Sequence, residues 1–382
     1  MIHKPSQRIA QIIGGWLVAL LAGGGAPATT AAELQMPDGG GYEFGRGLRL
    51  GDSGFTLGGY STVEYRHEER GAERLKSSHA SAFIWWEGGE HYKAFGEVDL
   101  LNATERSRGD GSDADRRFSL ERLYLEVVYN DLLTARLGKF LTPIGRWNPM
   151  HADPLVWTST QPLLMRSVFP HNLTGVMASG QLPLWGSGLG YDLYASNGGE
   201  WRADPGQDPF SLVRGGRLVL PLSFSGVQDL RLGASYARYQ QQRSRGDARK
   251  LAGVDLFWSS KGWELSAEWL RSTAIRPALL PGPAPGRSDA DVSPSYAPFG
   301  DNIPAARSAY LQGVMPLANS LYAVARLDWI RDPSLPFSVR QPLLGLAWRP
   351  TPGASIKLEW LQTRLGAAGP LQGLVASASV LF

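Results

Sequence analysis

The sequence predicts an all-β fold: a transmembrane antiparallel β-barrel of about 16 strands, with short turns at one rim and long loops at the other. Three observations predict it. Apolar and polar residues alternate with period two, the alternating segments run for about ten residues, and short and long connections follow one another in turn. A soluble β-sandwich also alternates, but its strands average about 5–6 residues, so the sandwich explains the pattern less well.

Each predicted strand is an alternating stretch that ends at a turn signal rich in glycine, proline, asparagine or serine. The predicted strands cover residues 54–66, 79–87, 91–101, 118–129, 132–140, 173–182, 188–197, 213–224, 229–240, 249–258, 263–271, 307–316, 320–329, 342–349, 354–363 and 372–382. Short connections, such as GGE at 88–90 and PTPG at 350–353, alternate with longer ones. An even strand count returns both ends of the barrel to the short-turn rim, which we predict to be periplasmic.

In several predicted strands, alternation gives one apolar face and one face that carries charge. In residues 321–330, Leu327 and Trp329 share a side, whereas Arg326 and Asp328 share the other. Tryptophans also gather near segment ends, as the aromatic girdles of membrane barrels do. Because both signs of charge occur on the second face, we expect little preference between cations and anions. The residues that we predict to line a water-filled lumen are Lys93, Glu97, Asp99, Arg122, Glu126, Arg136, Glu264, Glu268, Arg326, Asp328, Lys357 and Glu359.

The first 32 residues are typical of a secretory signal peptide, with a basic start, an apolar stretch and small residues before Glu33. Cleavage is expected after Ala28 or Ala32. A membrane-spanning helix is the alternative, but glycines interrupt the apolar run and no cationic stop follows it. The predicted organisation is therefore a signal peptide at 1–32, a short periplasmic segment at 33–53 and the barrel at 54–382.

Charge and cysteine content exclude several classes of function. The formal net charge is only +3, and removing the signal peptide brings it closer to zero, which argues against a nucleic-acid partner. The chain has no cysteine, so disulfides, thiol catalysis, iron–sulfur clusters and cysteine-based zinc sites are excluded, as is a lipid-modified N-terminal cysteine. We expect no cofactor.

With these features together, the whole chain resembles a Gram-negative outer-membrane porin. Within that group, the segment LYLEVVYNDLLTARLGKFLTPIGRWN at 123–148 resembles the strand–turn–strand unit of the phosphate-selective (O/P-like) porin superfamily, in which a phrase like GKFLTP opens a long loop. The mixed charges of the predicted lumen depart from the arginine ladder of that superfamily. Phosphate specificity is therefore not expected here.

The loop at about 141–172 is the third long connection. The porin resemblance implies that this loop folds into the barrel and narrows the pore. The loop is also too apolar to remain entirely in water, since it contains several tryptophan, leucine and valine residues. The residues that we predict at the constriction are Arg146, Trp147, Asn148, His151, Asp153 and Arg166.

The predicted function is passive diffusion of small polar or charged solutes across the outer membrane. The alternatives are an adhesin or structural barrel, and a barrel enzyme. We predict no enzymatic activity, no catalytic residue and no metal site, because the histidines accompany no recognisable serine motif and His151 and Asp153 lack further ligands at suitable spacing.

The last residues, GLVASASVLF at 373–382, are predicted to form the closing membrane strand, with Ser377 and Ser379 turned inward. The porin resemblance implies that Phe382 is the signal read by the outer-membrane barrel assembly machinery. It also implies a homotrimer. The expected partners are thus outer-membrane lipid, small polar solutes or ions, the assembly machinery and further copies of the chain.

Overall fold

The computed structural model describes most of the chain, and most of the described residues are in strands. The described residues are 40–69, 73–108, 117–150, 152–167, 169–184, 188–199, 209–224, 229–242, 248–274, 307–331, 338–365 and 370–382, with the side chains of 101–108 and a few others outside this description. The predicted signal peptide at 1–32 lies outside the described residues, as does the loop at 275–306. No described helix is long and apolar enough to cross a membrane.

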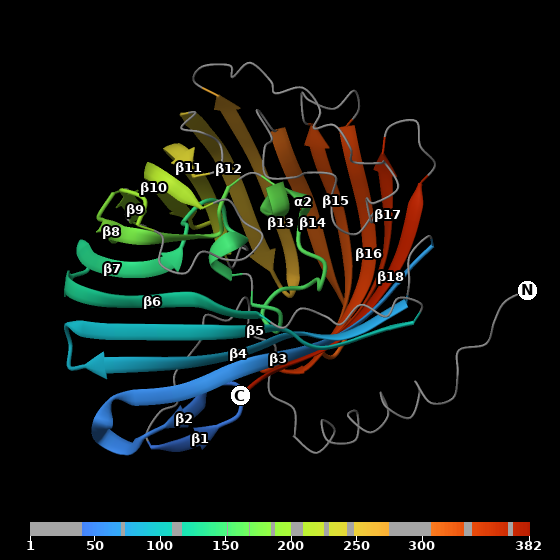
Figure 1. The fold of residues 1–382 in the computed structure, drawn as a ribbon, viewed down its shortest axis with the longest axis horizontal. Coiled ribbons are helices and arrows are strands. Elements are labelled where there is room, and N and C mark those ends of the chain that lie inside the picture. Colours follow the sequence, from blue (N-terminus) through green and yellow to red (C-terminus); the bar gives the residue numbers. More distant parts are fainter. Residues whose placement is uncertain are drawn as a thin grey trace, which may run out of the picture.

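A closed barrel of 16 antiparallel strands forms the body of the protein (Figure 1). Its strands are β3 (Phe55–Glu68), β4 (Glu73–Gly88), β5 (Tyr92–Arg108), β6 (Arg117–Asn130), β7 (Leu133–Leu141), β8 (Asn172–Leu182), β9 (Leu189–Ser196), β10 (Phe210–Leu222), β11 (Asp229–Gln241), β12 (Arg249–Ser260), β13 (Trp263–Ala274), β14 (Arg307–Ala318), β15 (Leu321–Arg331), β16 (Ser338–Thr351), β17 (Ala354–Leu365) and β18 (Leu371–Leu381). Each strand pairs with the next, and β18 pairs with β3, so no barrel edge is left open. The predicted fold class is confirmed.

The strand ends form two different rims. At one rim the turns are tight, for example at 131–132, 261–262, 319–320 and 352–353, and we call it the short-turn rim. Two of these turns place a non-glycine residue at positive φ, Lys261 at 51° and Ser320 at 62°. The connections 142–171 and 275–306 leave from the opposite rim, which we call the long-loop rim.

Several strands begin earlier than the alternation predicts, and the difference is largest for β4 and β16. β4 starts at Glu73 instead of 79, and its pairing with β5 shifts between Ser77 and His79. β16 starts at Ser338 instead of 342. A bulge interrupts the period-two pattern, so alternation alone misses the part of β4 beyond it.

A short N-terminal hairpin was not predicted. Its strands, β1 (Gly41–Glu43) and β2 (Gly47–Arg49), pair with each other, and β2 continues onto the start of β3. The hairpin turn touches the β16–β17 turn, where a Cβ on Gly353 would lie 2.8 Å from Cα of Gly45. The hairpin therefore lies at the short-turn rim, beside the end of β18.

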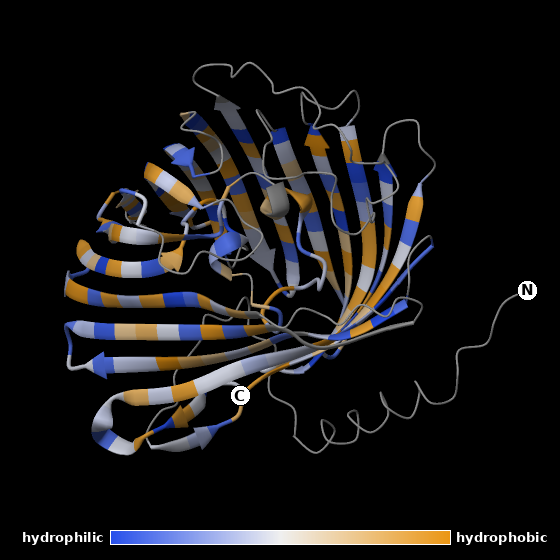
Figure 2. Ribbon diagram, viewed as in Figure 1, coloured by the Kyte–Doolittle hydropathy of each residue, from blue (hydrophilic) through white to orange (hydrophobic). Residues whose placement is uncertain are grey.

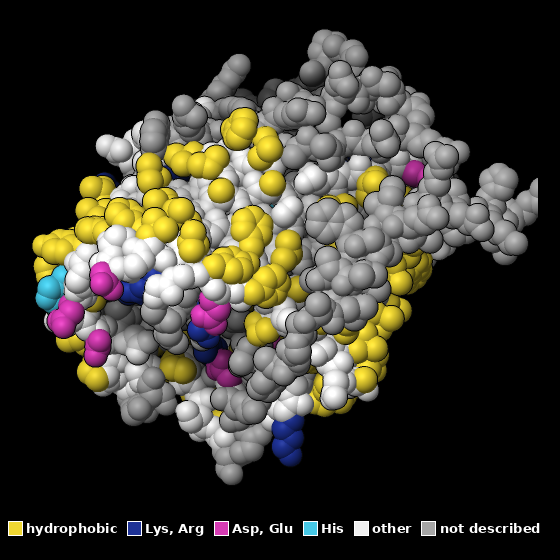
Figure 3. Space-filling model, turned by 90° about the horizontal axis from the view of Figure 1, so that it is seen from below, with side chains coloured by type: hydrophobic (Ala, Val, Ile, Leu, Met, Phe, Trp, Pro, Cys, Tyr) yellow, Lys and Arg dark blue, Asp and Glu magenta, His cyan; other side chains and the backbone are white. Residues whose placement is uncertain are grey.

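The two faces of the strands differ as the sequence predicts. Leu327 is 51% exposed on the outside of β15, whereas its neighbours Arg326 and Asp328 are 3% and 0% exposed on the inside. Alternating hydrophobic and hydrophilic bands along the strands are visible in Figure 2. Hydrophobic side chains cover much of the described outer surface in Figure 3. Such an exterior suits contact with lipid, where water is absent.

Candidate functional site: a loop bound inside the barrel

The connection between β7 and β8 enters the barrel and lies against the inner surface of β13–β18. It contains a short 3-10 turn, Asn148–Met150, and the helix α2, Leu163–Ser167. Figure 1 shows this green segment and α2 within the space enclosed by the strands, and α2 packs against β14 and β15. Many polar contacts join this loop to inward-facing side chains of the barrel wall.

Glu268 on β13 holds the start of the loop. Its Oε1 accepts hydrogen bonds from the backbone N–H of Arg146 at 2.9 Å and of Trp147 at 2.6 Å, and from the Tyr310 hydroxyl at 3.0 Å. The preceding Gly145 has φ of +64°, and a Cβ there would lie 2.0 Å from Oε2 of Glu268. Only glycine fits this close approach without movement.

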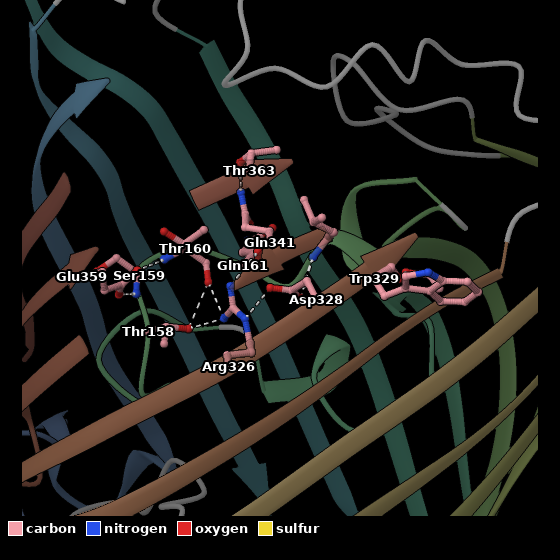
Figure 4. A network of polar contacts seen from close by, with 12 residues as sticks. Thr158, Ser159, Thr160, Gln161, Arg326, Asp328, Trp329, Gln341, Glu359 and Thr363 are labelled. Atoms are coloured by element: carbon pink, nitrogen blue, oxygen red, sulfur yellow. Dashed lines mark hydrogen bonds and ion pairs between the residues drawn. The ribbon is translucent and has the colours of Figure 1, made fainter. Parts of the chain in front are cut away.

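Arg326 and Asp328 on β15 form a fully buried ion pair under the loop, with Nε and Oδ2 2.8 Å apart. Figure 4 shows the arginine directed at the loop, where Nη1 donates to Oγ1 of Thr158 at 2.6 Å and to the Thr160 carbonyl at 2.7 Å. Asp328 in turn accepts from the backbone N–H of Leu163 at 3.2 Å. The pair therefore bonds to backbone and hydroxyl groups on both sides of residue 161.

Lys357 and Glu359 on β17 bind the middle of the loop. The Lys357 ammonium donates to the Asp153 carbonyl at 2.5 Å, and Glu359 accepts from the backbone N–H of Thr160 at 3.1 Å and from that of Ser159. Trp157 donates from its indole N–H to Glu264 on β13 at 2.6 Å. Six predicted lumen residues are thus inward-facing but bound to the loop or buried beneath it: Glu264, Glu268, Arg326, Asp328, Lys357 and Glu359.

Arg349 on β16 is an anchor that the sequence did not reveal. Its Nη2 donates to the carbonyls of Leu155 at 2.9 Å and Val156 at 2.7 Å, and its guanidinium lies 3.7 Å from the Trp157 ring centroid. It stands at the end of the predicted segment 342–349, two positions from the small and apolar Ala347. The one available signal was its position, since alternation places Arg349 on the same inward side as Ala347. No other charged residue lies on that side of the predicted segment.

The apolar part of the loop packs against the wall and against itself. Trp147, Val156, Leu164 and Met165 are all 5% exposed or less, and the Trp147 ring lies edge-on to Tyr310 at 6.0 Å. Arg146 stacks on Phe257 at 3.6 Å, and burial lowers the pKa of this guanidinium from its ordinary value. Burial of these side chains adds hydrophobic stabilisation to the polar anchors.

Asn148 closes the base of the loop. Its side-chain amide donates to the carbonyls of Thr142 at 2.7 Å and His171 at 2.9 Å, which joins the two ends of the segment. Of the other predicted constriction residues, His151 lies outside the described residues, and so does the side chain of Arg166. The structure therefore brings together Arg146, Trp147, Asn148 and Asp153 on the inner wall.

Asp153 pairs with His79 on β4, with Oδ2 and Nδ1 3.3 Å apart. Burial alone would raise the pKa of the Asp153 carboxyl, but His79 and Lys357 outweigh burial and hold this pKa well below its usual range. The sequence offered no link between these residues, which are far apart in the chain. This contact joins the loop to the β4 side of the barrel.

Asp153→Asn should remove an ion-pair stabilisation of the folded barrel that the wild type keeps at acidic pH, because the Asp153 carboxyl stays charged there. The unfolded carboxyl binds a proton near its ordinary pKa of about 3.9, and the folded one only at lower pH, so the contribution is present above that value and is lost as pH falls further. We expect the wild type to remain more stable than the variant down to about pH 4, and the difference in unfolding free energy to shrink only below that pH. Urea unfolding at a series of pH values measures it.

Asp229→Asn is the matched control, since the partly exposed Asp229 forms its ion pair with the nearby Arg231, at 2.9 Å, and exposed pairs contribute little. A difference for Asp153→Asn that disappears already near pH 5.5 would contradict the depressed pKa.

The inner wall of β5–β7 and β10–β12 carries arginine–carboxylate pairs. Arg122 binds Glu97 at 2.5 Å, Arg136 binds Glu126 at 2.5 Å, and Arg217 binds Asp255 at 2.7 Å. In each pair the arginine side chain is the more exposed member, at 15%, 22% and 13% against 1%, 10% and 4% for the carboxylates. The guanidinium groups therefore face the interior and cover their carboxylates.

Aromatic rings support these arginines. Arg122 lies 4.4 Å from the Phe95 ring centroid and Arg136 lies 4.2 Å from that of Tyr124, and the two rings stack on each other at 5.6 Å. Two more predicted lumen residues share this wall: Lys93, 6.0 Å from the Trp85 ring, and the buried Asp99. A guanidinium over a ring face is held by cation–π attraction and can still donate hydrogen bonds from its edge.

The inside of the barrel shows no metal-binding cluster within the described stretches, where no three histidine or carboxylate residues lie together. The charged groups of the inner wall instead fall into two sets, those bound to the loop and the arginine–carboxylate pairs of β5–β7 and β10–β12.

Phe382 lies at the short-turn rim, with its ring half exposed on the outer face. Its backbone exchanges two hydrogen bonds with Gly59 on β3, both 2.8 Å long. The last residue is therefore part of the seam that closes the barrel.

Comparisons with known proteins agree on the fold. No family model matches the chain. An uncharacterised protein of Aquifex aeolicus (strain VF5) is 24% identical over 235 residues, which are 56% of this chain and 51% of that protein, so the chain spans about half the length of this curated relative.

Solved structures match over most of the chain at low identity. They include the anion-selective porin from Comamonas acidovorans (13% identical, TM-score 0.57, 86% of this chain and 99% of that one) and Salmonella typhi OmpF in complex with daunomycin (9%, 0.58, 87% and 99%). Pseudomonas putida OprB is a third (8%, 0.57, 87% and 95%). At such low identity, structural similarity shows the fold alone. The chain has the 16-strand barrel fold of the outer-membrane porins.

Proposed function

We propose that the protein is an outer-membrane porin, a water-filled channel for the passive diffusion of small polar or charged solutes. One observation carries the proposal: a closed barrel with an apolar exterior encloses charged side chains, and a loop bound to part of the inner wall leaves other arginines of that wall partly exposed. A barrel with only a structural role would not need partly exposed arginines on its inner wall.

The cell outer membrane is the proposed location. The segment 1–32 is proposed to direct export as a signal peptide, and 33–53 to remain on the periplasmic side with the short-turn rim. The fold neighbours named above are outer-membrane porins, which supports this location. Because residues 123–148 resemble the phosphate-selective superfamily, the protein is also proposed to be related to it. Phosphate specificity is not part of this proposal.

The loop at 141–172 is proposed to form the constriction, with Arg146, Trp147, Asn148, His151, Asp153 and Arg166 as its contributing residues. Its anchors run from β13 round to β18 and across to His79 on β4, which supports a narrowing of the lumen by the loop. The remaining passage is proposed to run between the loop and the arginine wall of β6, β7 and β10.

The passage is proposed to favour anions modestly. This departs from the sequence expectation of little preference, because the carboxylates of the arginine wall are buried behind their partners and four acidic lumen residues are covered by the loop: Glu264, Glu268, Asp328 and Glu359. The anion-selective porin of Comamonas acidovorans shows that the fold can have such a preference.

Planar lipid bilayers test the function. Purified, refolded protein should give discrete conductance steps, and under a salt gradient the reversal potential should show the anion as the more permeant ion. A folded barrel without conductance would instead support the structural or adhesin alternative, and turnover of ester or peptide substrates by a closed barrel would support an enzyme.

Deleting Phe382 should impair assembly in the outer membrane while export proceeds. The deletion removes both backbone hydrogen bonds to Gly59 and the proposed signal for the assembly machinery. Cell fractionation measures it, by the share of heat-modifiable folded barrel in the outer membrane. Phe382→Tyr, which keeps an aromatic ring and the backbone pair, is the control. Normal amounts of folded barrel from the deletion would contradict the role.

Homotrimeric assembly is part of the proposal. One of the fold neighbours, OmpT of Vibrio cholerae folded in vitro, has been solved in a trimer form. Cross-linking of the purified protein in mild detergent, read on a denaturing gel, tests it by the appearance of a threefold species.

A further inference from the structure

A row of cationic side chains runs along the outside of the barrel near the long-loop rim. Every strand from β10 to β17 contributes one member, each exposed and each on the same face as the apolar residues of its strand. We call it the cationic row; it consists of Arg214, Arg238, Lys250, Arg271, Arg307, Arg331, Arg340 and Arg364.

The strand register places these cations directly beside one another. Arg214 is the cross-strand partner of Arg238, which is that of Lys250. A second set follows on β13–β15, where Arg307 is opposite both Arg271 and Arg331. The third set is the pair of Arg340 and Arg364 on β16 and β17.

The three sets form one continuous row. Lys250 is opposite Thr273, two residues from Arg271, and Arg331 is opposite Ser338, two residues from Arg340. Each step of two residues keeps the next cation on the outer face and compensates for the tilt of the strands. The row therefore follows the rim and does not drift across the barrel.

Like charges placed directly opposite each other destabilise a sheet unless something compensates them. In the described part of β10–β17, no aspartate or glutamate stands on the outer face, and no ion pair joins a member of the row to a described carboxylate. Arg364 bonds only to the neutral amide of Gln362 among these residues, at 2.9 and 3.0 Å. An anionic partner outside the described residues would therefore relieve the repulsion between these cations.

An aromatic layer marks the depth of the row in a membrane. Tyr236, Trp269, Trp329 and Trp360 lie on the outer face, two or four residues from the nearest cation of their own strand and further from the rim. Exposed leucines follow toward the middle, such as Leu327 at 51% and Leu344 at 57%. Tyrosine and tryptophan prefer the level of lipid headgroups, so the row lies at or just beyond that level.

From this geometry we propose that the cationic row binds the phosphate groups of anionic lipids in the leaflet at the long-loop rim. Arginine suits this partner, since its planar fork donates two parallel hydrogen bonds to phosphate. A second copy of the chain is a poor occupant, because the same row on each copy would repel the other. The proposal rests on the transmembrane barrel and is independent of whether the lumen conducts.

Lipid binding tests the proposal directly. The wild-type barrel in neutral detergent is titrated with lipid A, a glycolipid with two phosphates, and with the same lipid after removal of both phosphates, and bound lipid is counted by native mass spectrometry. We expect lipid A to bind and the dephosphorylated lipid to bind at least about tenfold more weakly, as expected for loss of several charge contacts.

The triple variant Arg271→Gln, Arg307→Gln and Arg331→Gln removes the central set. We expect about tenfold or greater loss of lipid A affinity, with unchanged heat-modifiable mobility on a gel as proof of folding. The triple lysine variant at these positions keeps the charge and should retain most of the affinity. A matched control, Arg46→Gln, Arg49→Gln and Lys261→Gln, removes three cations at the short-turn rim and should bind lipid A as the wild type does.

Two results would overturn the proposal while the barrel itself is folded normally. One is equal affinity of the wild type for lipid A and its dephosphorylated form. The other is equal loss of affinity in the central variant and the short-turn-rim control, which would show a general effect of net charge. Inorganic phosphate at the same phosphate concentration should compete poorly; full competition would mean that the row binds the free ion and not the lipid.

Discussion

Arg326→Met should destabilise the folded barrel by about 3–5 kcal/mol and loosen the inner loop. The substitution keeps the bulk of the side chain but leaves Asp328 as a buried charge without its ion-pair partner, and it removes the donors to Thr158 and Thr160. Both groups are fully buried, so water cannot replace the lost interactions. Guanidinium unfolding followed by tryptophan fluorescence measures the change in unfolding free energy.

Arg122→Met is the matched control. It also leaves a buried carboxylate, that of Glu97 at 1% exposed, without its ion-pair partner, but Arg122 binds Glu97 and lies on the Phe95 ring instead of holding the loop. We expect a loss of stability of the same kind but no change in loop attachment. The double variant Arg326→Met with Asp328→Asn should recover part of the stability, because no buried charge then remains. Equal protease sensitivity of the loop in Arg326→Met and Arg122→Met would contradict the anchoring role.

Deleting residues 146–166 should raise single-channel conductance several-fold, the largest functional effect we expect. The deletion removes the part of the loop that lies against β13–β18, and the wall strands keep their backbone pairing with one another. The cross-section available to water then extends to the wall itself. Planar bilayer recordings at one salt concentration measure the change, with folded barrel verified by its heat-modifiable mobility.

The same deletion should also weaken the anion preference. It uncovers the carboxylates of Glu264, Glu268, Asp328 and Glu359 and only three cations, Arg326, Arg349 and Lys357. The reversal potential should therefore move toward that of a cation-permeable channel. Shortening the connection 197–209, which joins β9 and β10, is the control and should leave conductance close to that of the wild type. Unchanged conductance after deletion of 146–166 would count against the constriction.

Much of the fold could be predicted from the sequence, because the alternation of apolar and polar residues in a strand is visible in consecutive residues. Leu327, Arg326 and Asp328 occupy the predicted faces, since a lipid-facing strand cannot exchange its two sides without exposing charge to lipid. Boundaries failed where the pattern itself is interrupted, as at the bulge between Ser77 and His79. The hairpin of β1 and β2 was missed because strands of three residues carry no period.

The contacts of the candidate site were much less accessible from the sequence. Asp153 was considered beside His151 because they are close in the chain, yet it pairs with His79 on another strand. Likewise Arg349 was overlooked, although it holds two carbonyls of the loop. Sequence proximity says little about which wall residues a long loop will reach, since its backbone groups bind whatever inward side chains lie across the barrel.

The sequence by itself determined the barrel, its approximate strand count and the inward side of the strands that alternate clearly, because period-two alternation follows directly from strand geometry. Only the tertiary structure decided which inward charges bind the loop and which arginines face the passage. It also decided that eight separate outward cations become neighbours in one row. These features depend on the register between strands and on the path of the loop, which are set by closure of the whole barrel and leave no local signal in the chain.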